Sequence, residues 1–402
     1  EPTLIEEEKK QLQMIREFLF EQIDITMSEL GSGEKAEEYL RDLVRETVKN
    51  FHIQVNECSL GKILYYIIRD YVGYGMIDVM MKDNLIEDIG CNGLNIPVYV
   101  WHRDYESVPS NVAFASEEEL DSFIIRLAYR TGRMISLANP MLDATLPDGS
   151  RIHATYGRTI TKHGSAFTIR KFRADPLTIV DMIRLNTLSS EIAAVLWYLI
   201  ESKHNVLVCG PTASGKTTML NCLSSFIDPN AKIVTIEDTP ELQLHHENWI
   251  RLVTRSAIGA SAEISLFDLL TAALRQRPDY LIIGEIRGKE GYTLFQAMAT
   301  GHLSLSTLHA DSITSVMRRL ESEPINIPKS LISGLNVITI QERMEREGRP
   351  IRRTTVVAEI IGLDQRTNEI ITNDVFRHKV DADVHQCSGR CHFLEKISIK
   401  KG

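Results

Sequence analysis

The segment Gly210-Pro-Thr-Ala-Ser-Gly-Lys-Thr-Thr218 decides the fold class of this sequence. It has the pattern G-x-x-x-x-G-K-[ST], it follows the apolar stretch Asn205–Cys209, and an apolar helical pattern begins near Lys216. In that context glycines let backbone N–H groups surround phosphates, and the helix N-terminus adds the positive end of a dipole. The sequence therefore predicts a nucleotide-binding loop, in which Lys216 reaches the β- and γ-phosphates and the Thr217 hydroxyl binds Mg²⁺. The predicted nucleotide-binding residues are Gly210, Pro211, Thr212, Ala213, Ser214, Gly215, Lys216, Thr217 and Thr218.

The stretch from about residue 190 onward alternates between helical and strand patterns. Short apolar strands are expected at Lys232–Asp238, Tyr280–Ile286 and His302–His309, with a helix at Leu266–Arg277 between two of them. Such alternation is typical of a largely parallel sheet covered by helices. Ligands bind beyond the carboxyl ends of the strands in these sheets, and polar residues cluster there in this sequence.

Acidic residues follow two of the predicted strands. Glu237 and Glu241 come after one strand, and Glu285 follows Gly284 at the end of another. A glutamate beside a γ-phosphate can orient and polarise the attacking water, so these glutamates are candidate catalytic residues. The alternative is that the acids are surface residues in loops between the sheet and its helices. Their place on the same sheet edge as the nucleotide-binding loop favours the catalytic interpretation.

Two histidines, His302 and His309, flank the fourth predicted strand, and Ser306 and Thr307 lie at its end. A histidine near a γ-phosphate can sense the charge of that phosphate by hydrogen bonding. A single histidine is more often a structural group with its hydrogen bonds satisfied. The spacing alone leaves a functional and a structural role equally open.

Changes of pattern divide the chain into four parts. A helical subdomain is predicted for residues 1–89, a mixed α/β unit for residues 90–173, a linker for residues 174–189 and a nucleotide-binding domain for residues 190–402. The helical part is either a subdomain in its own right or a docking platform for a partner, and the sequence leaves both open.

The composition excludes several classes of protein. The chain of 402 residues is 43% hydrophobic and 25% charged, which excludes a wholly disordered or fibrous chain. Its longest apolar run, Ile192–Ile200, is less than half of the ~20 residues that a membrane span needs. A net charge of −9 makes the chain a poor candidate for wrapping duplex nucleic acid, although a local basic channel stays compatible. Six cysteines are too sparse for a disulfide scaffold and fit a reducing, cytoplasmic compartment.

Two clusters lie towards the C-terminus. The first offers zinc ligands in a spacing that fits no common zinc pattern, so a solvated tail is favoured; its members are His378, His385, Cys387, Cys391 and His392. The second is basic and is expected at a solvated turn, the competing idea being a contact with an acidic loop of a membrane partner. It comprises Arg343, Arg346, Arg349, Arg352 and Arg353.

Four segments resemble the Walker A, Asp box, Walker B and His box of the secretion ATPase superfamily. In order, they are Gly210–Thr218, Glu237–Glu241, Leu281–Glu290 and Thr300–His309. Members of this superfamily drive type II and type IV secretion, type IV pili and archaeal flagella. The segments from Tyr74 to Ile89 and from Pro97 to His102 resemble the N-terminal part of the archaeal branch. The chain has no C-x-x-C pair between Cys222 and Cys387, unlike the tetracysteine insert of bacterial type II members, which also favours that branch.

The resemblance implies a RecA-like ATPase core that follows a PAS-like α/β domain and assembles as a homohexameric ring. It implies ATP and Mg²⁺ as ligands and catalytic roles for Glu285, Glu241 and Glu237. It also implies that Arg151 and Arg170 complete the nucleotide site, with Arg158 a weaker third candidate. The physical reason is that a fixed guanidinium offsets the negative charge on the γ-phosphate during its transfer. The alternative is a pair of strand arginines in surface ion pairs.

The predicted function is a cytoplasmic, Mg²⁺-dependent ATPase that powers protein secretion or the assembly of a pilus- or flagellum-type filament. It is expected at the inner face of the cell membrane, which it reaches only through a polytopic inner-membrane platform protein. No nucleic acid is expected as a ligand. One rival is a nucleic-acid motor of the conjugation type, which DNA-stimulated hydrolysis would favour. A second rival is a nucleotide-gated scaffold that binds ATP without useful turnover, which a phosphate-release assay would distinguish.

Overall fold

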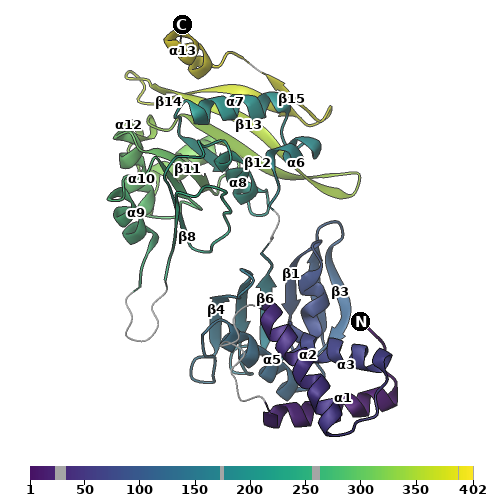
Figure 1. Ribbon diagram of the computed structural model, residues 1–402. Helices are drawn as coiled ribbons and strands as arrows, with labels where there is room; N and C mark the ends of the chain where they lie inside the picture. Colours follow the sequence, from purple (N-terminus) through teal and green to yellow (C-terminus); the bar gives the residue numbers. More distant parts are fainter. Residues whose placement is uncertain (23–32, 173–175, 256–262, 388, 402) are drawn as a thin grey trace. The chain divides into compact units, whose positions relative to one another are not determined.

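The computed structural model describes residues 1–22, 33–172, 176–255, 263–387 and 389–401 (Figure 1). The chain forms two compact units, Glu1–Phe172 and Arg173–Gly402. The first unit contains a helical bundle and an antiparallel sheet, and the second contains a larger mixed sheet with helices on both faces. The predicted α/β class is confirmed.

Three helices of the first unit pack around a small core of their own. They are α1 (Glu6–Gln22), α2 (Gly33–Asn50) and α3 (Glu57–Tyr71). Their apolar residues recur at helical spacing and are buried, among them Ile15, Leu40 and Ile67. The short helices η1 (Gly75–Ile77) and α4 (Asp78–Lys82) lead into the sheet.

The sheet of the first unit has, within the described residues, six antiparallel strands in the order β3-β2-β1-β6-β5-β4. Its elements are β1 (Ile86–Cys91), β2 (Pro97–His102), β3 (Glu106–Ala113), α5 (Glu117–Arg130), β4 (Met141–Thr145), β5 (Arg151–Thr155) and β6 (Ala166–Arg170). The first and last strands pair at the centre, and the apolar face of α5 packs on the sheet through residues such as Phe123 and Ile124. Strand β1 crosses the boundary predicted between residues 89 and 90, so the predicted helical part is too long.

The sheet of the second unit has nine strands in the described part of the chain, in the order β15-β14-β13-β12-β7-β11-β10-β8-β9. They are β7 (Val206–Cys209), β8 (Ile233–Glu237), β9 (Trp249–Val253), β10 (Tyr280–Ile283), β11 (Leu303–Leu308), β12 (Val337–Arg346), β13 (Arg349–Leu363), β14 (Ile370–Lys379) and β15 (Val384–Cys387). Strands β12 and β7 to β11 run parallel, as the alternating pattern predicts, and β13 to β15 extend the sheet in antiparallel fashion. The carboxyl ends of the parallel strands therefore share one edge.

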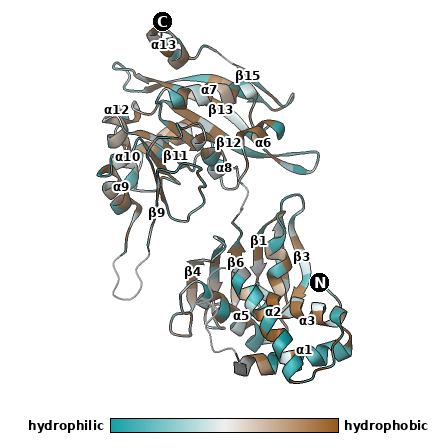
Figure 2. Ribbon diagram, viewed as in Figure 1, coloured by the Kyte–Doolittle hydropathy of each residue, from teal (hydrophilic) through white to brown (hydrophobic). Residues whose placement is uncertain are grey.

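Helices cover both faces of this sheet and enclose two apolar cores. The helices are α6 (Ile179–Arg184), α7 (Ser190–Glu201), α8 (Lys216–Ser224), α9 (Leu266–Leu274), α10 (Glu290–Ala299), α11 (Ile313–Glu321), α12 (Lys329–Ile332) and α13 (His392–Lys401). Alternate residues of β7 enter opposite cores: Val206 and Val208 join one with α7 and α8, and Leu207 and Cys209 join the other with α9, α10 and α11. In Figure 2 the strands at the centre of this sheet are mostly brown, which is the pattern of a sheet buried on both faces.

Three segments predicted to be a linker, a solvated turn and a solvated tail are folded in the structure. Much of the predicted linker 174–189 belongs to the second unit, because α6 has a capping box at Thr178 and Met182 is buried in the core; residues 174 and 175 lie outside the described residues. The prediction that the basic residues lie on a solvated turn holds only at the tip of a hairpin. Strands β12 and β13 form this long hairpin, and Arg353 is buried in it.

The predicted solvated tail is also wrong. Strand β15 pairs with β14, and Cys391 is buried at the start of α13. The carboxylate of Glu359 on β13 accepts hydrogen bonds from the backbone N–H groups of His392 (2.8 Å) and Phe393 (3.1 Å), so it caps α13. Among the described residues no group of three or more His, Cys, Asp or Glu could hold a metal ion.

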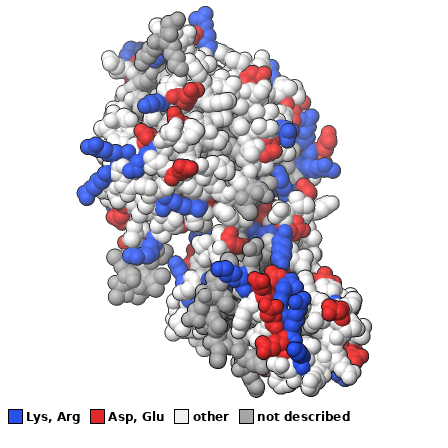
Figure 3. Space-filling model, viewed as in Figure 1, with Lys and Arg blue, Asp and Glu red and all other residues white. Residues whose placement is uncertain are grey.

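No helix in the described ranges is long and apolar enough to cross a bilayer. On the face that Figure 3 shows, basic and acidic side chains are interspersed on each unit.

Candidate active site

The loop Gly210–Gly215 connects β7 to α8 at the carboxyl edge of the nine-stranded sheet. A Cβ atom on Gly210 would lie 2.3 Å from the carbonyl oxygen of Gln341 on β12, so only glycine fits there. Gly215 has a φ of 91°, in the left-handed region, and is the residue from which α8 starts. Both glycines of the motif are thus required by the path of the backbone, and the first N–H groups of a helix that starts here can bind an anion.

Lys216 is buried at the start of α8. Its Nζ atom donates to the carbonyl oxygen of Pro211 at 2.8 Å and lies 3.4 Å from Nδ1 of His309. Burial lowers the pKa of Lys216, and the Glu285 carboxylate opposes that shift. The ammonium is therefore already inside the loop, where a phosphate would replace the Pro211 carbonyl as its partner.

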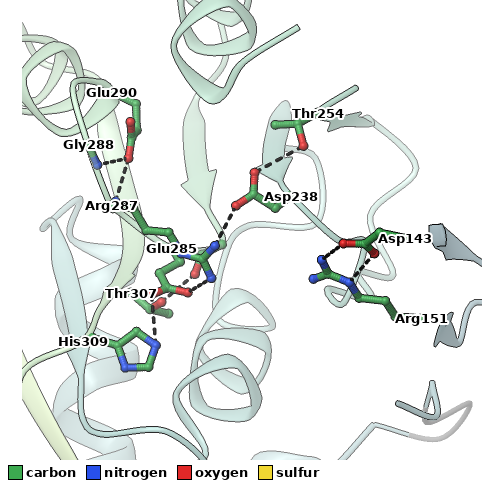
Figure 4. A network of polar contacts seen from close by, with 11 residues as sticks. Asp143, Arg151, Asp238, Thr254, Glu285, Arg287, Gly288, Glu290, Thr307 and His309 are labelled. Carbon is green, nitrogen blue, oxygen red and sulfur yellow. Dashed lines mark hydrogen bonds and ion pairs between the residues drawn. The ribbon is translucent and has the colours of Figure 1, made fainter. Parts of the chain in front are cut away.

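Glu285 follows β10 and has a donor at each carboxylate oxygen. Oε2 accepts from Nη2 of Arg287 at 2.6 Å, and Oε1 lies 3.0 Å from Nε2 of His309 (Figure 4). Because Nδ1 of His309 faces the Lys216 ammonium, we assign the proton of the neutral imidazole to Nε2. Burial and the Lys216 charge lower the pKa of His309, which agrees with a neutral ring.

A further pair of contacts continues from Arg287. Its Nη1 atom lies 3.2 Å from Oδ2 of Asp238, and Oδ1 of Asp238 accepts from the Thr254 hydroxyl at 3.2 Å. The contacts thus run in the order of the strands β7-β11-β10-β8-β9. The residues that follow these strands are, in the same order, Lys216 with its loop, His309, Glu285 with Arg287, Asp238 and Thr254.

Glu237 and Glu241 have different surroundings. Glu237 is only 2% exposed, and its Oε1 accepts the backbone N–H groups of Glu241 and Leu242, both at 2.9 Å. Burial raises the pKa of Glu237. Its carboxylate therefore shapes the loop after β8, whereas the side chain of Glu241 is exposed and its charge acts on Lys216.

The structure does not bring His302 to this edge. His302 precedes β11 and His309 follows it, so the six residues of the strand separate them by about 20 Å. Nδ1 of His302 lies 3.4 Å from the Thr300 hydroxyl, close to the end of α10. This position favours the structural role that the sequence left open for His302.

The candidate arginines lie in the first unit, where both make ion pairs. Nη2 of Arg151 is 2.8 Å from Asp143, and Nε of Arg170 is 3.3 Å from Asp88. Arg151 and Arg170 are direct partners across β5 and β6, so their side chains share one face of the sheet. Arg158 pairs with Glu117 at 3.1 Å.

Two arginines near the loop have roles that sequence reasoning missed. Nε of Arg352 on β13 donates to the carbonyl oxygen of Ala213 at 3.0 Å, a contact that depends on the long-range pairing of β12 beside β7. The place of Arg287, two residues after Glu285, could have indicated a contact with that glutamate. Its contact with Asp238 could not be predicted, because it depends on the order of the strands in the sheet.

Comparison with known proteins adds the family. The sequence model described as "Type II/IV secretion system protein" matches residues 81–398, which is most of the chain. The chain belongs to this family. The resemblance drawn from the four boxes is thereby confirmed.

Relatives within the family support the archaeal type. An uncharacterised protein of Methanocaldococcus jannaschii is 41% identical over 338 residues, covering 84% of this chain and 61% of the relative. A second one from that organism is 52% identical over 219 residues, covering 54% of this chain and 81% of the relative. A Mycobacterium tuberculosis protein named for conjugal transfer is 29% identical over 262 residues, covering 63% of this chain and 73% of the relative. The chain thus spans only about three fifths of the first relative's length.

Two solved structures agree with the fold. The ATPase DotB of Legionella pneumophila has a TM-score of 0.52 at 20% identity, covering 72% of this chain and 80% of its own. The pilus retraction motor PilT, solved with bound ADP, has a TM-score of 0.51 at 22% identity, covering 73% and 84%. These matches confirm the fold class of a RecA-like core preceded by a smaller α/β domain.

Proposed function

We propose that this chain is a Mg²⁺-dependent ATPase that powers protein secretion or the assembly of a pilus- or flagellum-type filament. The observation that supports it most is the set of direct contacts Lys216–His309–Glu285. These contacts link the cation of the nucleotide-binding loop to a carboxylate at the end of a neighbouring strand. A cation for the phosphates and a carboxylate for the attacking water are the two groups that hydrolysis of ATP requires at one site.

The residues of the loop fit a nucleotide and its metal. The Gly210 backbone packs directly on Gln341, and the cradle between β7 and α8 leaves the N–H groups at the start of α8 to bind phosphate oxygens. Magnesium takes few ligands from the protein and several from phosphates and water, so one hydroxyl in the first turn, that of Thr217, meets its requirement. Bound Mg²⁺ would neutralise charge on the phosphate oxygens.

The chain's own residues divide the work of the reaction. Lys216 holds the β- and γ-phosphates, and Pro211 releases the ammonium as they enter. Glu285 accepts a hydrogen bond from the attacking water and polarises it, while the Nε2–H group of His309 keeps the carboxylate oriented. Arg151 and Arg170, presented on one sheet face, complete the site across a domain closure or a subunit boundary.

Membership of the family supports the proposed assembly and location. A homohexamer would let the arginines of one subunit serve the loop of its neighbour. Its partner would be a polytopic inner-membrane platform protein, and the ring would stay cytoplasmic and peripheral to the membrane. The four-part division at residues 1–89, 90–173, 174–189 and 190–402 needs revision at β1 and α6, and we propose Glu1–Phe172 and Arg173–Gly402 as the two units instead.

One rival function has an observation in its favour. Relatives from Mycobacterium tuberculosis and Sinorhizobium fredii are named for conjugal transfer, and conjugation moves DNA. The net charge of −9 opposes a nucleic-acid motor, as do the interspersed charges on the face that Figure 3 shows.

The test of the proposal is Mg²⁺-dependent phosphate release by the purified chain, with and without single- and double-stranded DNA. Release that is unchanged by DNA and abolished by a chelator supports the proposal. Release that depends on DNA supports the conjugation rival. ATP binding without release supports a nucleotide-gated scaffold.

A further inference from the structure

Arg287 lies between two carboxylates that follow different strands. Its Nη2 atom donates to Glu285 at 2.6 Å and its Nη1 atom to Asp238 at 3.2 Å (Figure 4). Glu285 follows β10 and Asp238 follows β8, which are parallel neighbours in the sheet. One guanidinium therefore bridges the ends of two adjacent strands.

The backbone of Arg287 is fixed at its base. The buried carboxylate of Glu290, the first residue of α10, accepts the N–H groups of Arg287 and Gly288, both at 2.6 Å. The loop between β10 and α10 is thus anchored from within. Arg287 starts from a rigid point, which reduces the conformational freedom of its side chain.

Asp238 is fixed on its far side. The Thr254 hydroxyl donates to Oδ1 of Asp238 at 3.2 Å, and the backbone N–H of Thr254 donates to the carbonyl oxygen of Glu237 at 3.1 Å. The carboxylate that receives Arg287 is therefore tied to the end of the next strand, β9. Arg287 has an anchor at both ends, which an isolated surface ion pair lacks.

We propose that Arg287 is a positioning residue for Glu285, and that it acts through Asp238. With Nε2 of His309 on one oxygen and Arg287 on the other, the Glu285 carboxylate is held in one orientation. This inference rests on the proposed function, in which Glu285 polarises the attacking water. Asp238 then contributes to turnover without touching the nucleotide.

An arginine is required for this arrangement. Its planar guanidinium presents several N–H donors at fixed angles and can serve two carboxylates at once. A lysine at the same position would keep the charge but would present one ammonium, which reaches one carboxylate well or two poorly. Arg287→Lys should therefore restore only part of what Arg287→Gln loses.

The experiment measures ATP turnover and the affinity for a non-hydrolysable ATP analogue in the full chain. The variants are Arg287→Gln, Arg287→Lys, Asp238→Asn and the double variant Asp238→Asn/Arg287→Gln. The matched control is Arg377→Gln, because Arg377 also forms an exposed pair with an aspartate, Asp374, but lies on β14. Urea unfolding of the same proteins gives a double-mutant cycle for the Asp238–Arg287 pair without nucleotide.

We expect Arg287→Gln to lower kcat by roughly 10- to 100-fold, the cost of a misplaced catalytic group, with analogue affinity changed less than about threefold. Asp238→Asn should lower kcat in the same direction, and the double variant should be no slower than Arg287→Gln alone. The unfolding cycle should show coupling between the two residues, and Arg377→Gln should match wild type in turnover.

Two results would overturn the inference while leaving the proposed function intact. The first is wild-type turnover in Arg287→Gln. The second is an Asp238→Asn loss that multiplies with the Arg287→Gln loss, since independent effects exclude action of one through the other. A wild-type chain that binds the analogue yet releases no phosphate would instead overturn the proposed function, and this role of Arg287 with it. If Arg287→Gln fails to fold, Arg287→Lys and Asp238→Asn decide the matter by the same criteria.

Discussion

Nδ1 of His309 lies 3.4 Å from Nζ of Lys216, and the other ring nitrogen faces Glu285 at 3.0 Å. A single imidazole thus contacts both the cation that would hold the phosphates and the carboxylate that would polarise water. Besides burial, the charge of the Lys216 ammonium is one of the causes that lower the pKa of His309. A phosphate that binds Lys216 would therefore also change the electrostatic surroundings of His309.

The two histidines of the His box should behave differently. His309→Ala removes the donor that orients Glu285 and should lower turnover by about 10²-fold, the scale of a positioned acid–base group. His302→Ala, at the opposite end of β11, should leave turnover within about twofold. Steady-state phosphate release on both variants checks this. Equal losses in the two would show that the strand's polarity does not separate their roles.

Replacement of Gly210 and of Gly61 by alanine should change the stability of the fold in opposite directions. Gly210→Ala places a Cβ 2.3 Å from the Gln341 carbonyl oxygen and should destabilise the fold and weaken ATP binding. Gly61 lies in α3 with nothing within 4 Å of a Cβ, so Gly61→Ala should stabilise by about 0.5–1 kcal/mol. Urea unfolding measures both changes. A stable, ATP-binding Gly210→Ala protein would contradict the close packing of β7 on β12.

His385 makes stability depend on pH. Its burial, and next the neighbouring His378, lower the pKa of His385 from 6.5 to about 4. The unfolded chain takes up this proton below pH 6.5, whereas the folded chain resists until about pH 4, so the contribution of His385 is fully present above pH 6.5 and is lost as the pH falls towards 4.

His385→Phe should therefore flatten the fall in unfolding free energy between pH 6.5 and pH 4. The exposed His245→Asn is the matched control and should keep the wild-type slope. Urea unfolding across this pH range is the measurement. An unchanged slope in His385→Phe would mean that another group carries the acid sensitivity.

Much of the site could be predicted because its chemistry is local. The roles of the loop Gly210–Thr218 and of the acids after β8 and β10 can be predicted from a few adjacent residues. His302 shows where local sequence is insufficient. The sequence places one histidine at each end of β11, and only the direction of β11 relative to β7 shows which of the two lies at the edge of the nucleotide-binding loop. Glu237 has the residue type of a catalytic acid, but its burial and its two backbone N–H donors arise from the folding of the following loop.

The C-terminal third was harder to predict for a physical reason. Strand β12 lies beside β7 although more than a hundred residues separate them in the chain, and that pairing places Arg352 on the loop. Arg353, one residue further on, turns to the other face and binds Asp383 at 2.6 Å. The pattern of charges along the sequence alone cannot show that the side chains of Arg352 and Arg353 have different partners.

Arg151 and Arg170 should act on a nucleotide loop outside their own sheet. Truncating either should cost ~10³-fold or more in turnover, by analogy with arginine fingers, with little loss of ADP affinity. Mixing Arg170→Ala with Lys216→Ala proteins tests this. If the arginine acts in trans, mixed rings regain activity, because an intact loop can sit beside an intact arginine. Full turnover by Arg170→Ala alone would remove that residue from the site.

Glu285 should polarise the water that hydrolyses the nucleotide bound by Lys216. The measurement is phosphate release paired with binding of a non-hydrolysable ATP analogue, for wild type, Lys216→Ala and Glu285→Gln. Lys216→Ala should lose high-affinity binding, because the phosphates lose the cation of the loop. Glu285→Gln should bind the analogue like wild type and release phosphate at least about 10²-fold more slowly. A Glu285→Gln protein that hydrolyses ATP at near the wild-type rate would contradict this role of Glu285.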